Sequence, residues 1–140
     1  MYRLLFGQKR VFEDLSLLLL RLFMGGTFIV YVSKKILNFD NYVILFSDKL
    51  DLPLPLLNLY LVIAVEAIGG VLLLIGLFTR LATIPLIITM ITALFLVNLE
   101  KGFAASNFGM EIPLAYISIL FVLFAFGSGK FSLENKKTSE

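Results

Sequence analysis

The sequence has no cysteine, no histidine and no tryptophan among its 140 residues. Without thiolates the chain cannot hold an iron–sulfur cluster or exchange disulfides, and without imidazole it lacks the commonest haem and metal ligand. We therefore predict no metal site, and any electron transfer must use a bound organic molecule or a partner protein. The absence of cysteine leaves the redox compartment undetermined.

Charged residues are scarce as well, because they make up 16% of the chain while 59% of the residues are hydrophobic. Soluble domains have roughly 45–50% apolar and about 25% charged residues, so the excess apolar surface here needs lipid to cover it. The net charge of +2 is small and the basic residues lie at segment ends, which argues against nucleic-acid binding. We expect an all-α polytopic membrane protein in contact with the lipid bilayer.

Four apolar segments are long enough, or nearly so, to cross a membrane. A spanning helix needs about 20 apolar residues, and backbone groups in lipid must be hydrogen-bonded within the segment. The sequence therefore predicts a single membrane domain over 1–140, a four-helix bundle with a short polar tail at 130–140. The expected helices are 15–34, 56–78, 81–99 and 112–127.

An even number of spans places both termini on one side of the membrane. That side would carry seven cations: Arg3, Lys9, Arg10, Arg80, Lys130, Lys136 and Lys137. The other side would carry four: Lys34, Lys35, Lys49 and Lys101. Because cytoplasmic loops are enriched in Lys and Arg, we expect both termini in the cytoplasm.

Two charged residues, Arg21 and Glu66, lie inside the expected spans. A charge in a membrane segment is costly and is normally turned inward and paired. Arg21 would lie about 9 Å from the cytoplasmic end of its helix and Glu66 about 18 Å, a gap that an extended arginine can largely close. Gly25–Gly26 and Gly69–Gly70 fall at similar depths and would let the helices approach closely. We predict an Arg21–Glu66 pair.

Two interpretations of this pair stay open. It can fix the helix register and have no chemical role, as buried ion pairs sometimes do. Alternatively, Glu66 is a catalytic carboxylate that accepts a proton beside a ligand, and Arg21 orients it. Near the external face, Lys35 and Glu111 are either part of a solvated rim or contacts for the polar head group of a ligand. A helix start favours an acid, so Glu111 also fits the role of a cap.

The chain resembles the DoxX family of small four-helix membrane proteins over roughly residues 18–134. The resemblance rests on ordered motifs, which are Arg21-Leu-Phe-Met-Gly-Gly26, Lys35, Glu66-Ala-Ile-Gly-Gly70, Gly76-Leu-Phe-Thr-Arg80, Gly102-Phe103, Gly109-Met-Glu111 and Gly127-Ser-Gly-Lys-Phe-Ser-Leu-Glu134. Many members of the family have histidines where this chain has Asn98 and Tyr31. These two positions therefore join the predicted ligand-binding set, although an Asn cannot shuttle a proton as imidazole does.

The resemblance implies a membrane subunit of an oxidoreductase system in a bacterial-type inner or plasma membrane. Such a subunit would bind a lipid quinone or quinol and work with an oxidoreductase partner that supplies the metal or flavin. Two alternatives remain: a non-enzymatic anchor or assembly partner for a soluble enzyme, and, ranked below it, a small transporter. Whether the chain is itself an enzyme, and whether it forms a homo-oligomer, are left open by the sequence.

Overall fold

The computed structural model describes residues 9–137, and this part of the chain is α-helical with no β-strand. The expected all-α class is therefore confirmed for the described residues. The α-helices are α2 (Lys9–Leu37), α3 (Phe39–Ile44), α4 (Pro55–Ile75), α5 (Thr79–Ala93), α6 (Glu111–Phe126) and α7 (Leu133–Lys137). Arg3, which the charge argument used, lies outside the described residues, and so does the last part of the polar tail, 138–140.

Among the described residues, three helical stretches are long and apolar enough to cross a membrane: Arg10–Leu37, Pro55–Ile75 and Thr79–Lys101. The third extends α5 through a π-helical turn, Leu94–Asn98, and a 3-10 turn, Leu99–Lys101. Helix α6 is also apolar but has 16 residues, which gives a length of about 24 Å against a hydrocarbon layer of roughly 30 Å. The fourth span and the cytoplasmic termini therefore stay predictions.

The turn between α4 and α5 is short because a glycine ends α4. Gly76 has φ +69°, a left-handed conformation that glycine adopts without steric cost, and its N–H donates to the carbonyls of Leu72 and Leu73. Only Leu77 and Phe78 separate this residue from Thr79, the first residue of α5. The two helices consequently run in opposite directions as neighbours.

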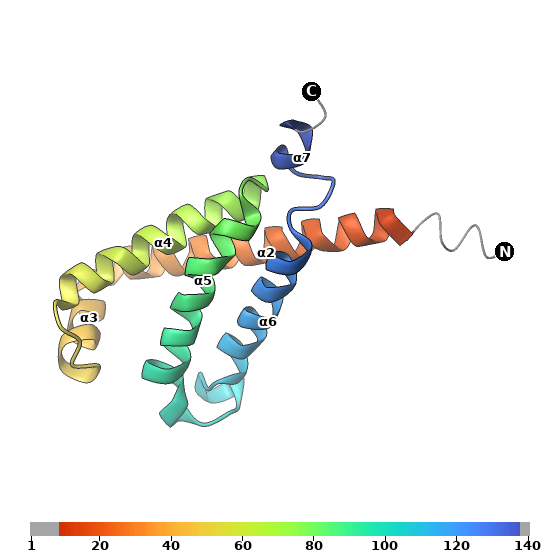
Figure 1. Ribbon diagram of the computed structural model, residues 1–140. Helices are drawn as coiled ribbons and strands as arrows, with labels where there is room; N and C mark the ends of the chain where they lie inside the picture. Colours follow the sequence, from red (N-terminus) through yellow and green to blue (C-terminus); the bar gives the residue numbers. More distant parts are fainter. Residues whose placement is uncertain (1–8, 138–140) are drawn as a thin grey trace.

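The helices pack mainly as two pairs, α2 with α4 and α5 with α6, which spread apart from the α4–α5 turn (Figure 1). Within the first pair, a Cβ placed on Gly25 would lie 2.8 Å from the carbonyl oxygen of Gly70. The two backbones thus approach as closely as the paired glycines predict. The segment between α2 and α4, with α3 and the π-helical turn Leu45–Lys49, packs against α4.

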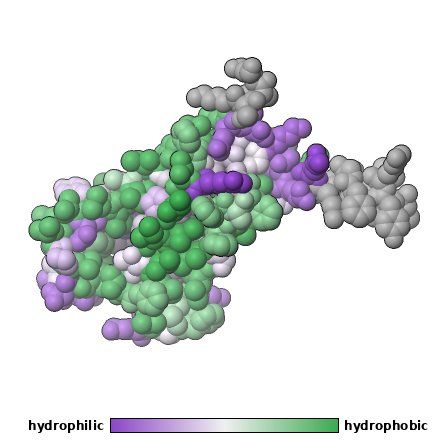
Figure 2. Space-filling view, in the orientation of Figure 1, coloured by the Kyte–Doolittle hydropathy of each residue, from purple (hydrophilic) through white to green (hydrophobic). Residues whose placement is uncertain are grey.

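A small apolar core joins the two pairs, and most other apolar side chains face outward. The core consists of Met24, Phe28, Leu73, Leu86, Met90, Leu120 and Leu123. Figure 2 shows hydrophobic residues over most of the visible surface of α4, α5 and α6. Such an outer surface is what lipid tails cover in a membrane protein.

Candidate functional site

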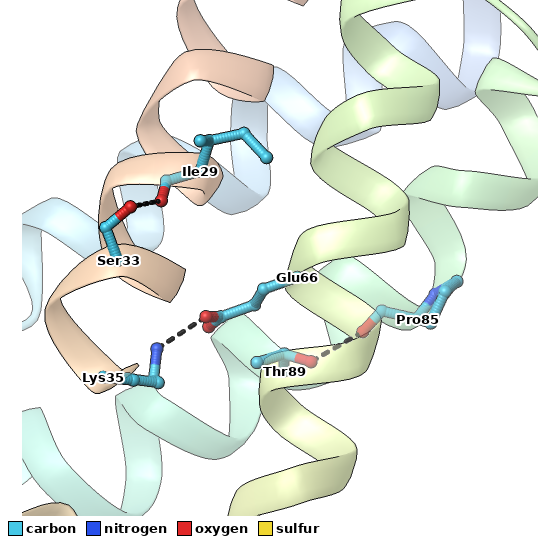
Figure 3. Close-up of polar contacts among 6 residues, drawn as sticks. All are labelled: Ile29, Ser33, Lys35, Glu66, Pro85 and Thr89. Atoms are coloured by element: carbon cyan, nitrogen blue, oxygen red, sulfur yellow. Dashed lines mark hydrogen bonds and ion pairs between the residues drawn. The ribbon is translucent and has the colours of Figure 1, made fainter. Parts of the chain in front are cut away.

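The central polar contact of the bundle joins α2 and α4. Glu66, in the middle of α4, is 1% exposed, and its Oε2 accepts a 2.6 Å hydrogen bond from Nζ of Lys35 (Figure 3). Lys35 lies in the last turn of α2, and its side chain is 12% exposed. A carboxylate buried this deeply is tolerated when a cation pairs with it, so the two residues form a structural unit, the Lys35–Glu66 pair.

The predicted Arg21–Glu66 pair is wrong. Arg21 lies beside Gly76, at the end of α4, because a Cβ on Gly76 would meet its guanidinium. Gly76 and Glu66 are ten residues apart, which corresponds to about 15 Å along the helix and exceeds what the arginine can span. Lys35 reaches Glu66 instead, since side chains on a helix lean toward its N-terminus and that direction carries the Lys35 ammonium back toward the middle of α2.

Aromatic rings from three helices surround the Lys35–Glu66 pair. The Nζ of Lys35 lies 5.5 Å from the ring centroid of Tyr31 on α2 and 5.8 Å from that of Tyr42 on α3. The ring of Tyr116 on α6 lies 6.2 Å from that of Tyr31. Ring faces attract a nearby ammonium, so Tyr31 and Tyr42 help Glu66 to hold the Lys35 ammonium in place, while Tyr116 packs against Tyr31.

The pair lies in the wall of a cavity of about 570 Å³. Its polar lining residues are Tyr31, Lys35, Tyr42, Asn58, Glu66, Thr89, Thr92, Asn98, Lys101 and Tyr116. The remaining lining side chains are apolar and come mainly from α4, α5 and the segment that contains α3. Thr89 donates to the carbonyl of Pro85, 3.0 Å away, so its hydroxyl is hydrogen-bonded within α5 (Figure 3).

The structure therefore brings four of the predicted site residues to one cavity: Tyr31, Lys35, Glu66 and Asn98. The Asn98 amide donates to the carbonyls of Phe108, at 2.6 Å, and Gly109, at 3.3 Å. Asn98 thus holds the loop that follows α5 while it lines the cavity.

Glu111 and Arg21 do not line this cavity. The Oε2 of Glu111 accepts a 2.8 Å hydrogen bond from the N–H of Ala105, and Glu111 begins α6, where the helix dipole favours an acid. Its contacts are those of a residue that orders the loop before α6.

Arg21 belongs to a second polar region at the other end of the bundle, the Arg21 cluster of Arg21, Gly76, Phe131, Ser132 and Glu134. Arg21 is 1% exposed and its Nη2 donates to the carbonyl of Phe131. The N–H of Glu134 donates to the carbonyl of Gly76, 3.2 Å away, and the Glu134 carboxylate interacts electrostatically with the guanidinium. Within the described part of the chain, the Nε and Nη1 of Arg21 have no hydrogen-bond partner.

Part of the expected polar tail is fastened to the bundle by this cluster and by a second contact. The N–H of Lys130 donates to Oδ1 of Asp14 on α2 at 2.9 Å. Residues 130–137 therefore fold back over the start of the bundle and end in α7, rather than extending into solvent.

Sequence reasoning missed Tyr42 and Tyr116. Tyr42 lies in the segment 36–55 between the first two expected spans, for which no site residue was predicted, and its ring lines the cavity. Tyr116 is the one tyrosine of α6, and a phenol within an apolar helix normally finds a polar partner. That rule is the signal that could have identified Tyr116.

The profile of the DoxX family matches residues 16–99, which include Arg21, Lys35, Glu66 and Asn98. An uncharacterized protein of Haemophilus influenzae is 29% identical over 126 residues, which cover 87% of this chain and 83% of that protein. No solved structure matches the chain.

Proposed function

Because the chain belongs to the DoxX family of membrane proteins, we propose that it is a membrane subunit of an oxidoreductase system whose cavity binds a lipid quinone or quinol. The observation that supports this proposal is the Lys35–Glu66 pair in the wall of an apolar cavity. There a donor and an acceptor lie together beside space for an apolar molecule.

The cavity has the size and composition of a site for an organic ligand. Its volume of about 570 Å³ lies within the roughly 300–1,000 Å³ of small-molecule sites, which are mostly apolar with a few polar groups that fix orientation. A quinone ring matches this lining, since it is flat and apolar with a carbonyl oxygen at each end. The rings of Tyr31, Tyr42 and Tyr116 provide aromatic surface beside the pair.

The pair supplies complementary hydrogen-bonding groups for the two forms of the ligand. The Lys35 ammonium has three donors and directs one of them to Glu66, so another is available for a quinone carbonyl. A quinol hydroxyl donates instead, and the Glu66 carboxylate accepts. Oxidation of a quinol releases two electrons and two protons. In our proposal Glu66 takes up one of these protons and the other is released to water. The electrons pass to the partner protein, because the sequence lacks the side chains that ligate metal clusters.

We further propose that α6 is the fourth span and that both termini lie in the cytoplasm of a bacterial-type cell. A helix shorter than the bilayer is accommodated by local thinning at a modest free-energy cost. The Arg21 cluster then lies at the cytoplasmic end of the bundle, and the cavity lies between the middle of the membrane and its external face.

The test is to purify the full-length protein with its associated proteins from native membranes in mild detergent. Extracted quinone and co-purifying subunits are then identified by mass spectrometry. We expect about one quinone per chain. We also expect Glu66→Gln to abolish quinol turnover by the complex while assembly survives. Glu100→Gln is the matched control, since Glu100 is exposed and does not line the cavity. Unchanged turnover in Glu66→Gln would rule out the proton role.

A second candidate function is a membrane anchor for a soluble enzyme. It is favoured by the C-terminal segment 130–137, which is hydrogen-bonded to the bundle. Asp14, Arg80, Lys130 and Asn135 line a polar hollow at that end of the bundle, which gives a partner an ordered surface. If the chain is an anchor alone, the Lys35–Glu66 pair is structural. Glu66→Gln should then lower protein level, assembly and activity in parallel, whereas loss of turnover with intact assembly contradicts this alternative.

A further inference from the structure

The cavity is open, and the residues at its edge are both cavity-lining and exposed, including Lys101 and Phe108 in the segment that follows α5. On α5 these are Ile88, which is 60% exposed, Thr92, and in the following π-helical turn Leu96, which is 41% exposed. They recur every four residues and therefore form a stripe along one face. Leu61 on α4, 54% exposed, also lines the cavity. The opening thus extends between α4 and α5, where the two helix pairs spread apart (Figure 1), and ends at Lys101 and Phe108.

With α5 as a membrane span, the part of this opening along Ile88 and Thr92 faces hydrocarbon rather than water. Ile88 is nine residues beyond Thr79, the first residue of α5, so it lies about 14 Å along a span that crosses a layer of roughly 30 Å. The stripe from Ile88 to Leu96 continues for about 12 Å from there. Glu66, which also lines the cavity, is 1% exposed and therefore lies inside the bundle.

We propose that the ligand enters sideways from the bilayer between α4 and α5, and that its hydrocarbon tail stays in this opening along Ile88, Thr92 and Leu96. The head group reaches the Lys35–Glu66 pair. The ligand class is consequently a long-chain amphiphile with an oxygen acceptor in its head, which excludes a water-soluble quinone analogue as the preferred ligand. This inference rests on the proposed function, because it assigns the path and the tail of the same ligand.

The test compares Ile88→Trp with the matched control Ile91→Trp. Both isoleucines lie on the exposed surface of α5, but Ile91 does not line the cavity. The probes are a decyl-substituted benzoquinone and its tail-less parent, titrated into full-length protein in mild detergent by calorimetry. We expect Ile88→Trp to weaken the decyl compound about tenfold, since the indole displaces several methylene contacts, and to leave the tail-less compound within about twofold. Ile91→Trp should change neither affinity.

The outcomes separate the two proposals. If wild-type protein binds neither probe, the quinone function fails. If it binds both and Ile88→Trp binds the decyl compound as well as wild type, the tail path is wrong while the quinone function stands. Equal loss of both probes in Ile88→Trp also overturns the tail path, because the substitution would then act on the head-group site. Leu96→Trp tests the same stripe and gives the same readout if Ile88→Trp does not fold.

Discussion

Helix α2 holds Arg21 near one end of the bundle and Lys35 near the other, and the two cations have different surroundings. Arg21 donates to the backbone carbonyl of Phe131 and packs directly on Gly76. Lys35 pairs with a carboxylate, between two tyrosine rings and beside a cavity of about 570 Å³. Arg21 is the more deeply buried of the two, yet it has no role at the cavity. The difference shows that burial of a charge does not by itself mark a candidate site, whereas adjacent space for a ligand does.

The largest effect is expected when the Lys35–Glu66 pair loses its cation. Lys35→Met leaves Glu66 buried without a counter-charge, which should lower the free energy of unfolding by about 3–5 kcal/mol. Thermal unfolding in detergent measures this change. The double variant Lys35→Met/Glu66→Gln should recover most of the loss, because no lone charge remains. Lys34→Met is the control, since Lys34 is an exposed neighbour on the same helix. Equal losses of unfolding free energy in Lys35→Met and Lys34→Met would mean that the pairing of Lys35 with Glu66 does not stabilise the bundle.

Gly76→Ala should disrupt the Arg21 cluster at the opposite end of the bundle. A non-glycine residue in the left-handed conformation costs about 1–3 kcal/mol, and here its Cβ would also overlap the Arg21 guanidinium. We expect a lower unfolding midpoint and faster proteolysis of the C-terminal segment, with quinone binding retained in the folded fraction. Gly26→Ala is the control, because a Cβ there meets nothing within 4 Å. Loss of quinone binding from folded Gly76→Ala protein would show that the two regions are coupled.

A smaller effect is expected from the ring of Tyr42. Tyr42→Leu removes the aromatic face near the Lys35 ammonium, a contact worth about 0.5–1 kcal/mol at partly exposed sites. The unfolding midpoint should fall slightly and quinone affinity should weaken a few-fold, as measured by calorimetry. Tyr42→Phe keeps the ring and should behave as wild type. If Tyr42→Phe is impaired as strongly, the hydroxyl rather than the ring is the important group.

The smallest effect is expected at Glu111, which does not line the cavity. Glu111→Gln keeps an oxygen that can accept the hydrogen bond from Ala105, so the free energy of unfolding should change by no more than about 0.5 kcal/mol. Quinone affinity, measured by the same titration, should stay the same. A clear loss of affinity would extend the ligand site beyond the cavity to the loop before α6.

Hydropathy predicted the helices well, because a long apolar run has few other stable conformations in lipid. The helix ends were less predictable. The first helix begins at Lys9 rather than at 15, an error that shifts any estimate of depth by about 9 Å. The start of a helix is also a poor reference for depth, because Arg21 lies beside Gly76 at the end of α4 and the residues of α2 before Arg21 extend past that end (Figure 1). Glu66 is ten residues farther along α4, where Lys35 reaches it instead.

The site was predicted only where local sequence carried the information. Glu66 stood out as an acid in an apolar helix, and Lys35 and Asn98 lie at the cavity as predicted site residues. The contributions of Tyr42 and Tyr116 depend on how α3 and α6 fold back on α2 and α4, and no spacing within one segment reveals that. The cavity itself results from the spreading of the two helix pairs, which is a property of packing rather than of any motif.

The contact between Arg21 and Phe131 also has a consequence for the order of events during biosynthesis. The acceptor carbonyl lies 110 residues after the guanidinium. A ribosome therefore makes nearly the whole chain before that hydrogen bond can form. Phe131 therefore cannot accept from Arg21 while α2 is being synthesised, and this contact closes only when the last part of the chain folds back onto the bundle.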